Sequence, residues 1–517
     1  MSEAAIYFRR IRPAFEDHSV DATFVSMAMQ NNQLTYTNAR EMFVVAIILQ
    51  FVLCWCSGEE QDVIAYPSIL EERMDGAALV VKITGDITLN LERSSVLADD
   101  LLFVTSNKEE DHVERVDTSF IQKNLYHDTH RQSSVMVRST EGAVQVEGIL
   151  GSELRIKPLL QAPRSLDGQI AHKVYEVEEI ADSRGMRMAY APPRKRGRRN
   201  GQRRNNTRKH EAAKPQDNSD SFVVEVHIIS DNKHQRSFKK NEELIAYMAI
   251  TTNAVNLRYL DMSRPKVSFI LVGITRSRDD AFATLHQGLL DAPATLGGLE
   301  KYIENGRVPG SNDIVLLVSG LDMFNKQNGK INTGLAGLAF CGTVCGKLKI
   351  AESEDIATTY NGITAIAHEL CHVMGSPHDE TPECPWEEGY LMSYVDGGLK
   401  KYRLSPCSEK AVRNVYQKLK PECIQVQTKT NYMEKHKQYP GQTVRAMYYC
   451  KKVLKKSGGR WFVKNPHDLS SKCKMACCHQ EAGLRYTCWT VSVLTGMSCG
   501  QGKTCRRGVC GKHKFLI

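Results

Sequence analysis

The placement of the cysteines constrains the fold of this chain more than any other feature of the sequence. Two of the sixteen cysteines, Cys54 and Cys56, lie in an apolar segment, and no other occurs before Cys341. The remaining fourteen crowd into the last third, an even number as a disulfide framework requires. Such density is typical of an oxidising compartment, so we expect the last third to depend on disulfides and the part before Cys341 to fold without them.

The apolar run Met42–Cys56 is too short to span a bilayer comfortably, which takes roughly twenty residues, but it suits the core of a signal peptide. A signal core normally starts near the beginning of a chain. We therefore expect residues 1–41 to be an upstream extension or artefact and residues 42–58 to be a signal peptide. This predicts a secreted, extracellular protein without a stable membrane anchor. A membrane-anchored type II protein is the alternative interpretation.

Residues 57–190 contain short runs that alternate apolar and polar residues, such as Ala78–Ile83 and Ala143–Ile149. This alternation predicts a mainly β domain. Nothing in this region has the pattern of a catalytic motif.

A basic run, Arg194–Lys209, then carries nine Lys or Arg and no acid. We expect it to be a solvated hinge, cut after Arg199 because Arg196–Arg199 fits the Arg-x-Arg-Arg pattern of furin-like convertases. Asn205 begins an Asn-x-Thr glycosylation acceptor, which suits an exposed segment. A nuclear-localisation or nucleic-acid patch is the alternative; the leader and the cysteines argue against it, and we expect no nucleic-acid partner.

Beyond the hinge, strands and helices alternate, which predicts an α/β layout. The patterns predict strands at Phe222–Ile229, Lys266–Ile274 and Asp313–Ser319, and helices at Glu242–Leu260, Thr295–Ile303 and Thr358–Met374. The last helix is followed by Gly375, a residue suited to the left-handed turn that closes a helix.

The candidate zinc-binding and catalytic residues lie at the end of that last helix and in the turn after it. His368 and His372 are four residues apart, so they project from one helix face and can reach a single zinc ion. Gly375 lets the chain turn sharply and bring His378 round as a third ligand. Glu369 is placed to take a proton from the water that the metal activates. The register of all five positions predicts a zinc hydrolase site.

At this point the sequence resembles the metzincins, whose HExxHxxGxxH pattern is followed by a methionine turn. Met392 supplies that turn, and Asp379 after the third histidine makes the chain resemble the reprolysin (adamalysin) family. The spread of features is similar to salivary metalloproteases of ticks. By that resemblance, Met392 forms an apolar floor beneath the ligands and Asp379 braces the site.

The resemblance covers most of residues 60–510 and implies an α+β or α/β fold. It implies a metzincin catalytic domain, with a twisted mixed sheet and a long active-site helix, at residues 220–425. Residues 59–199 would form a mainly β propeptide ending at the convertase site. Residues 426–517 would form a small, disulfide-rich domain similar to disintegrin-like and ADAMTS-type modules.

Three features depart from the family pattern. Cys371 stands where glycine is usual; we expect it in a disulfide with Cys341 or Cys345. The arrangement we favour is Cys341–Cys371, Cys345–Cys423 and Cys384–Cys407, out of fifteen pairings of six cysteines.

Tyr394, two residues after Met392, is the second departure. It either helps stabilise the oxyanion, as in the astacin branch, or only packs against its neighbours. The expected propeptide has no cysteine that could bind the zinc and inhibit the enzyme. Inhibition of the zymogen therefore requires steric blockade of the active site or another zinc ligand.

The last domain is basic: residues 426–517 hold eighteen Lys or Arg against three Asp or Glu, a net of +15, while the whole chain is +9. Either this is a solvated basic face or it binds heparin and other glycosaminoglycans. The resemblance also implies extracellular substrates such as fibrinogen, fibronectin or matrix proteins. Members of the family can bind calcium, so the resemblance allows a calcium site, but we find no calcium-binding motif in the sequence. A binding protein with a vestigial protease domain is the main rival interpretation.

Overall fold

The computed structural model describes residues 62–73, 78–140, 142–180, 221–426, 444–454, 458–481, 485–494, 496–500, 502–506 and 508–512. The predictions for the leader at residues 42–58, for cleavage after Arg199 and for glycosylation of Asn205 lie outside these residues. In the part of the chain that the structure describes, no helix is both long enough and apolar enough to cross a membrane.

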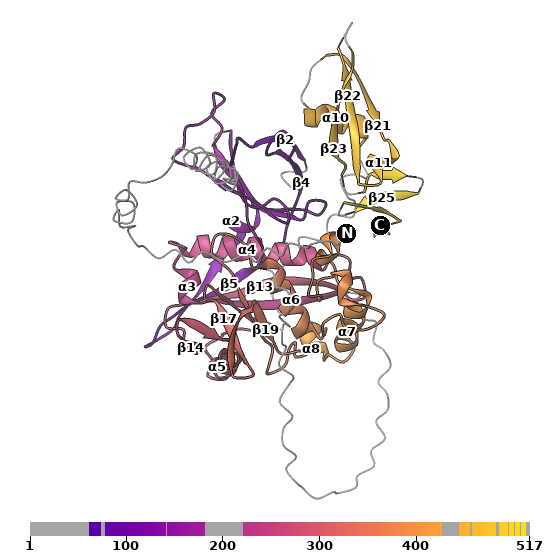
Figure 1. The fold of residues 1–517 in the computed structure, drawn as a ribbon. Helices are drawn as coiled ribbons and strands as arrows, with labels where there is room; N and C mark the ends of the chain where they lie inside the picture. Colours follow the sequence, from indigo (N-terminus) through magenta and orange to yellow (C-terminus); the bar gives the residue numbers. More distant parts are fainter. Residues whose placement is uncertain are drawn as a thin grey trace, which may run out of the picture. The chain divides into compact units, whose positions relative to one another are not determined.

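The region expected to be mainly β is built on a nine-stranded sheet with the order β1-β11-β10-β9-β8-β7-β4-β3-β2 (Figure 1). Its strands pair antiparallel and alternate buried with exposed or half-buried residues, as in β3 and β4, because one face covers a core. The strands are β1 (Val63–Ala65), β2 (Ser68–Arg73), β3 (Ala78–Lys82), β4 (Thr88–Arg93), β7 (Leu125–Asp128), β8 (Ser133–Thr140), β9 (Ala143–Ile149), β10 (Leu154–Pro158) and β11 (His172–Glu176).

The region expected to be catalytic, called the catalytic region below, is built on a seven-stranded mixed sheet with the order β19-β20-β16-β12-β13-β5-β6. Five strands run parallel, and the edge strands β19 and β6 run antiparallel to their neighbours. Its strands are β5 (Leu97–Ser106), β6 (His112–Asp117), β12 (Ser221–Ser230), β13 (Lys266–Ser277), β16 (Ile314–Ser319), β19 (Gly337–Ala339) and β20 (Ile350–Glu354).

Helices cover both faces of this sheet, which is why its central strands read as continuous apolar runs (Figure 1). One core cluster joins the sheet to α4 (Asn241–Arg258) and α6 (Ile363–Met374), and another joins it to α5 (Ala292–Glu304). Smaller elements complete the region: α2 (Ser119–Gln122), α3 (Asn232–Gln235), β14 (Leu285–His286), β15 (Leu289–Asp291), β17 (Met323–Gln327), β18 (Lys330–Leu335), η2 (Trp386–Glu388), η3 (Gly398–Tyr402), α7 (Pro406–Tyr416) and α8 (Pro421–Ile424).

Strands β5 and β6 of this sheet lie in the expected propeptide. The sequence did not predict that propeptide strands would join the sheet of the catalytic region. Strand β5 pairs parallel with β13, with Val104 opposite Thr275 and Phe103 opposite Ile274. Phe103 is fully buried in the same core cluster as residues of α4 and α6. The predicted boundary between propeptide and catalytic domain therefore separates segments of the sequence that share one core in the fold.

Helix α6 begins at Ile363 rather than at the predicted Thr358. Thr358 and Tyr360 have φ angles of 71° and 57°, in the left-handed region that a helix cannot use. For Thr358, a β-branched residue, this conformation is unfavourable. Residues 358–361 therefore form a constrained loop that leads into the helix.

The C-terminal domain consists of two three-stranded sheets held by four disulfides, as its cysteine density predicts. The bridges are Cys450–Cys477, Cys473–Cys505, Cys478–Cys488 and Cys499–Cys510. Its elements are α10 (Ala446–Leu454), β21 (Arg460–Lys464), α11 (His467–Ser470), β22 (Lys474–Gln480), β23 (Thr487–Ser492), β24 (Ser498–Gly500), β25 (Lys503–Arg506) and β26 (Val509–Gly511).

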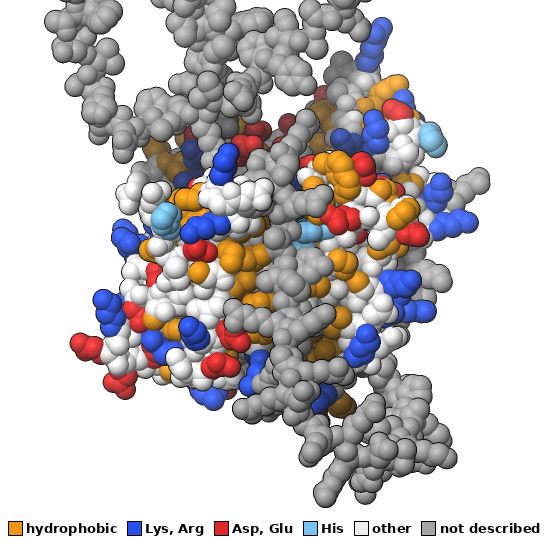
Figure 2. All heavy atoms as spheres, turned by 60° about the horizontal axis from the view of Figure 1, so that its bottom comes forward, with side chains coloured by type: hydrophobic (Ala, Val, Ile, Leu, Met, Phe, Trp, Pro, Cys, Tyr) orange, Lys and Arg blue, Asp and Glu red, His pale blue; other side chains and the backbone are white. Residues whose placement is uncertain are grey.

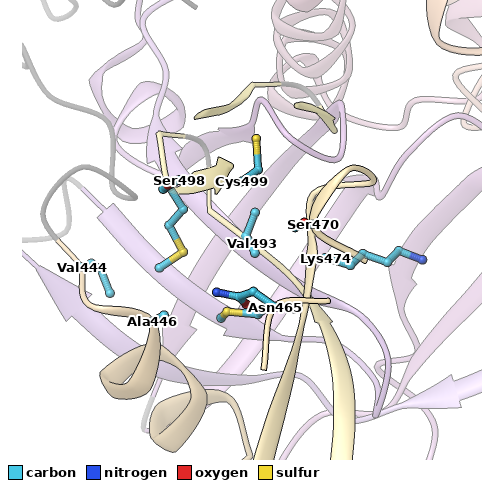
Figure 3. A pocket seen from close by; sticks show the side chains of 10 residues that line it. Val444, Ala446, Asn465, Ser470, Lys474, Val493, Ser498 and Cys499 are labelled. Carbon is cyan, nitrogen blue, oxygen red and sulfur yellow. The ribbon is translucent and has the colours of Figure 1, made fainter. Parts of the chain in front are cut away.

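This domain contains a cavity of about 240 Å³ (Figure 3). Val444, Val493 and Met497 give it apolar walls, and Asn465 and Lys474 contribute polar groups. It contains none of the residues expected to bind metal or act in catalysis.

We predict that Phe103→Ala destabilises the catalytic region, because β5 shares its core. Removing a fully buried phenylalanine typically costs roughly 3–5 kcal/mol. Urea unfolding of the full chain, followed through its first transition, measures this. Phe120→Ala, at a side chain that is 58% exposed, is the matched control. A loss for Phe103→Ala no larger than that of the control would contradict the shared core.

Candidate active site

Helix α6 and the turn after it bring three histidines together. His368 and His372 lie one helical turn apart, with their Nε2 atoms 3.0 Å from each other. Gly375 ends the helix with a φ of 112°, and a Cβ at this position would lie 2.3 Å from Cγ2 of Val415. Only glycine fits both the turn and the space. The turn places Nε2 of His378 at 3.2 Å from Nε2 of His372.

The opposite nitrogen of each ring is fixed by a hydrogen bond. Nδ1 of His368 donates to the Leu391 carbonyl at 2.8 Å, and Nδ1 of His372 donates to the Ser376 carbonyl at 2.7 Å. Because a carbonyl can only accept, each Nδ1 must carry the ring proton. Each Nε2 is then left with a lone pair, the form in which imidazole binds metal.

Burial keeps the rings of His368 and His372 neutral. It lowers the pKa of His368 to about 3 and holds the pKa of His372 well below its usual range. The neighbouring histidines add to the effect, since protonating one ring disfavours protonating the next. Three Nε2 atoms within 4.8 Å of one another form a donor set that fits zinc, which in a catalytic site takes one further ligand.

Asp379 connects the third histidine to two other elements. Its Oδ1 accepts hydrogen bonds from Ser405 at 2.6 Å and Ser408 at 3.2 Å, where Ser405 is the N-cap of α7. Its backbone N–H donates to the Met392 carbonyl at 3.0 Å. Asp379 thus fixes the segment after His378 against the methionine turn, and Met392 is fully buried in the core next to α6.

Tyr394 contacts a histidine in this structure. Its hydroxyl lies 2.9 Å from Nδ1 of His378 and donates to the carboxylate of Glu380. Since that hydroxyl proton goes to Glu380, the oxygen accepts from Nδ1 of His378, which fixes the tautomer of the third ring as well. The sequence analysis did not predict that Glu380 belongs to the site. Its position two residues after His378 is the one sequence feature that pointed to such a role.

Glu369 is also placed by its neighbours, two of which the sequence did not single out. It is fully buried on α6, and a Cβ on Gly337 of strand β19 would lie 2.6 Å from its Cγ. Gly337 therefore leaves the space that the Glu369 side chain occupies. Glu352 of β20 is fully buried nearby, and no described residue hydrogen-bonds either of its carboxylate oxygens. Burial, and then the charge of Glu369, raises the pKa of Glu352 well above its usual value.

The cysteines of this region follow two of the three expected pairings. The structure contains the bridges Cys345–Cys423 and Cys384–Cys407. The Cys341–Cys371 prediction is wrong for this structure, where both residues are free thiols. Cys371 is buried in α6, while Sγ of Cys341 lies 3.8 Å from the Ser376 carbonyl. Burial raises the pKa of the Cys341 thiol to about 11, so it stays protonated.

A buried three-histidine centre, with a glutamate next to His368 in the sequence, fits a zinc-dependent hydrolase, and comparison with known proteins identifies the class. Residues 222–427 match the model of the Reprolysin (M12B) family zinc metalloprotease. The chain thus carries a reprolysin-family zinc metalloprotease domain, and it is a zinc metalloendopeptidase.

Similar proteins agree with this assignment. Venom metalloproteinase antarease TserMP_A of Tityus serrulatus is 25% identical over 339 residues, which cover 60% of this chain and 82% of that protein. Venom metalloproteinase BumaMPs1 of Olivierus martensii is 25% identical over 391 residues, covering 72% and 95%. A Bombyx mori protein named "A disintegrin and metalloproteinase with thrombospondin motifs like" is 27% identical over 310 residues, covering 54% and 42%. The similarity to tick proteases stays a prediction.

We predict that Gly337→Ala lowers kcat/KM by about 100-fold without loss of zinc, because its Cβ would displace Glu369 by a fraction of an ångström or more. Hydrolysis of a quenched peptide and metal analysis of the matured enzyme measure the two effects. Gly297→Ala on α5, where an added Cβ meets nothing within 4 Å, is the matched control. Undiminished turnover by Gly337→Ala would show that Glu369 does not depend on this space.

We predict that Glu352→Gln stabilises the protein increasingly as the pH rises. The folded chain keeps the Glu352 proton, whereas the unfolded chain loses it above about 4.5, so the wild type loses stability as the pH rises above that value. Thermal unfolding should show a small difference between variant and wild type near pH 5 and a larger one near pH 8. The exposed Glu304→Gln is the control. A difference that does not change with pH would mean that Glu352 is ionised in the folded chain.

Proposed function

We propose that this protein is a secreted endopeptidase made as a zymogen, which hydrolyses peptide bonds in extracellular proteins. The observation that carries the proposal is the set of three Nε2 lone pairs, two of them on the helix that also carries Glu369. The six disulfides of the described residues and the expected leader support an extracellular location.

His368, His372 and His378 would hold one zinc ion, which when bound would polarise the scissile carbonyl and lower the pKa of water towards roughly 7. Glu369 then acts as the general base: it takes the proton of the attacking water and later passes it to the leaving amine. Glu352 keeps its own proton, so it places no second negative charge beside Glu369. Tyr394 is proposed to orient His378 rather than to act on the oxyanion, because its hydroxyl is directed at Nδ1 of that ring.

The proposed substrates are extracellular matrix or haemostatic proteins such as fibrinogen or fibronectin. The resemblance supports this class, and several relatives are named venom metalloproteinases. The face of the catalytic region in Figure 2 gathers apolar side chains in its middle and charged ones towards its rim, a distribution that suits contact with a polypeptide.

Heparin-like polyanions are proposed as a further partner of the C-terminal domain. The net charge of +15 over residues 426–517 supports this, and such binding weakens with salt. A furin-like convertase acting after Arg199 is the proposed maturation enzyme. Calcium is expected from the family alone, and we assign it no ligands.

We predict that Glu369→Ala abolishes peptide hydrolysis and leaves zinc binding intact, because the base is lost while the three histidines remain. A quenched peptide library, incubated with protein cut after Arg199, gives the rate, and a zinc chelator should abolish it as well. Glu383→Ala is the matched control and should keep full activity, because Glu383 is an exposed carboxylate five residues after His378.

Correctly folded, zinc-loaded wild type that cleaves no peptide or protein would favour the binding-protein interpretation. Activity that survives Glu369→Ala would instead show that another group accepts the proton.

A further inference from the structure

The end of the propeptide contacts the loop that leads into the active-site helix. Four successive carbonyls of this loop accept hydrogen bonds from propeptide donors: Thr358 O from Tyr175 Oη at 3.4 Å, Thr359 O from Arg155 Nε at 3.0 Å, Tyr360 O from Arg155 Nη2 at 3.2 Å, and Asn361 O from Ile180 N at 3.0 Å. These bonds help hold a loop whose φ angles at Thr358 and Tyr360 are unfavourable by themselves.

Glu179, the second-last described residue before residues 181–220, is surrounded by catalytic-region groups. The Thr364 hydroxyl of α6 donates to Oε2 of Glu179 at 2.7 Å. Arg258 at the end of α4 lies 3.6 Å from Oε1, and Lys401 of η3 lies 3.7 Å from Oε2. The propeptide's own Arg155 is 3.9 Å away.

This cluster is shielded from solvent. The side chains of Glu179, Arg155 and Arg258 are only 7%, 0% and 1% exposed. A buried carboxylate between three cations is strongly coupled to them, because losing it leaves positive charges buried without their partner. Glu179 thus fastens the propeptide to the start of α6 and to the segment after the methionine turn.

A second attachment lies at the far edge of the catalytic sheet. Strand β5 pairs along β13, and β8 contributes a hydrogen bond from the Ser134 hydroxyl to the Ile250 carbonyl of α4 at 2.9 Å. Arg307, beyond α5, pairs with Asp111 next to β6, with Nη2 2.6 Å from Oδ1. The β13 edge accepts the propeptide by strand addition, a mode in which backbone hydrogen bonds supply much of the affinity.

We infer that residues 62–180 stay bound to the catalytic domain after the chain is cut within residues 181–220, and that Glu179 is the anchor that sets how slowly they leave. This inference rests on the proposed maturation of a zymogen. The docking surface on the mature domain is then the β13 edge together with loop 358–361, Thr364, Arg258 and Lys401. Its partner is the chain's own propeptide, and cutting alone does not remove it.

The test uses the full chain with the recognition sequence of a site-specific protease placed within residues 194–209. After complete cutting, size-exclusion chromatography at micromolar concentration should show both fragments in one peak. The dissociation rate of the labelled propeptide should rise at least tenfold in Glu179→Gln, since a buried charge cluster loses its anion. Glu178→Gln, at the exposed neighbouring residue, should leave the rate within twofold.

Separate elution of the wild-type fragments would overturn the retention, and an unchanged rate in Glu179→Gln would overturn the anchor. If Glu179→Gln does not fold, Thr364→Val removes the shortest contact from the catalytic side and should raise the rate severalfold; no change there would again overturn the anchor. Because the engineered cut and the readouts need neither convertase nor peptidase activity, failure of the proposed function would show itself separately.

Discussion

The three hydrogen bonds to Nδ1 atoms of histidines determine what the rest of the site can do. The acceptors of these bonds are the Leu391 carbonyl, the Ser376 carbonyl and the Tyr394 hydroxyl oxygen, and each bond leaves a lone pair on the Nε2 that faces the other rings. Burial adds to this by keeping the rings of His368 and His372 neutral. The methionine turn and the turn after α6 are thus needed to orient the ligands as well as to shape the core.

Several close contacts around this centre allow only one kind of residue. Gly375 must turn left-handed against Val415, and Gly337 must leave the volume that Glu369 fills. At the other end of α6, loop 358–361 keeps its unfavourable backbone with the help of propeptide donors. The active-site helix is therefore held at its start by one segment of the chain and at its end by another, and this is how propeptide docking bears on the catalytic region.

The sequence predicted the local features well, because each depends on spacing along one helix or turn. The three histidines lie together as expected, Gly375 ends the helix, and the strands predicted at Phe222–Ile229 and Asp313–Ser319 appear in the structure within one or two residues. It missed what depends on distant segments: the addition of β5 to β13, the delayed start of α6 and the unpaired Glu352. The Cys341–Cys371 bond failed because an even cysteine count does not say which thiols meet in suitable geometry.

We propose that three preoriented imidazoles hold the metal and that the thiol of Cys371, on the same helix as His368 and His372, does not. X-ray absorption at the zinc edge of the full chain tests this most directly. We expect one zinc per chain with imidazole nitrogens at about 2.0–2.1 Å and no sulfur neighbour. A scattering contribution from sulfur at about 2.3 Å, or far less than one zinc per chain, would contradict it.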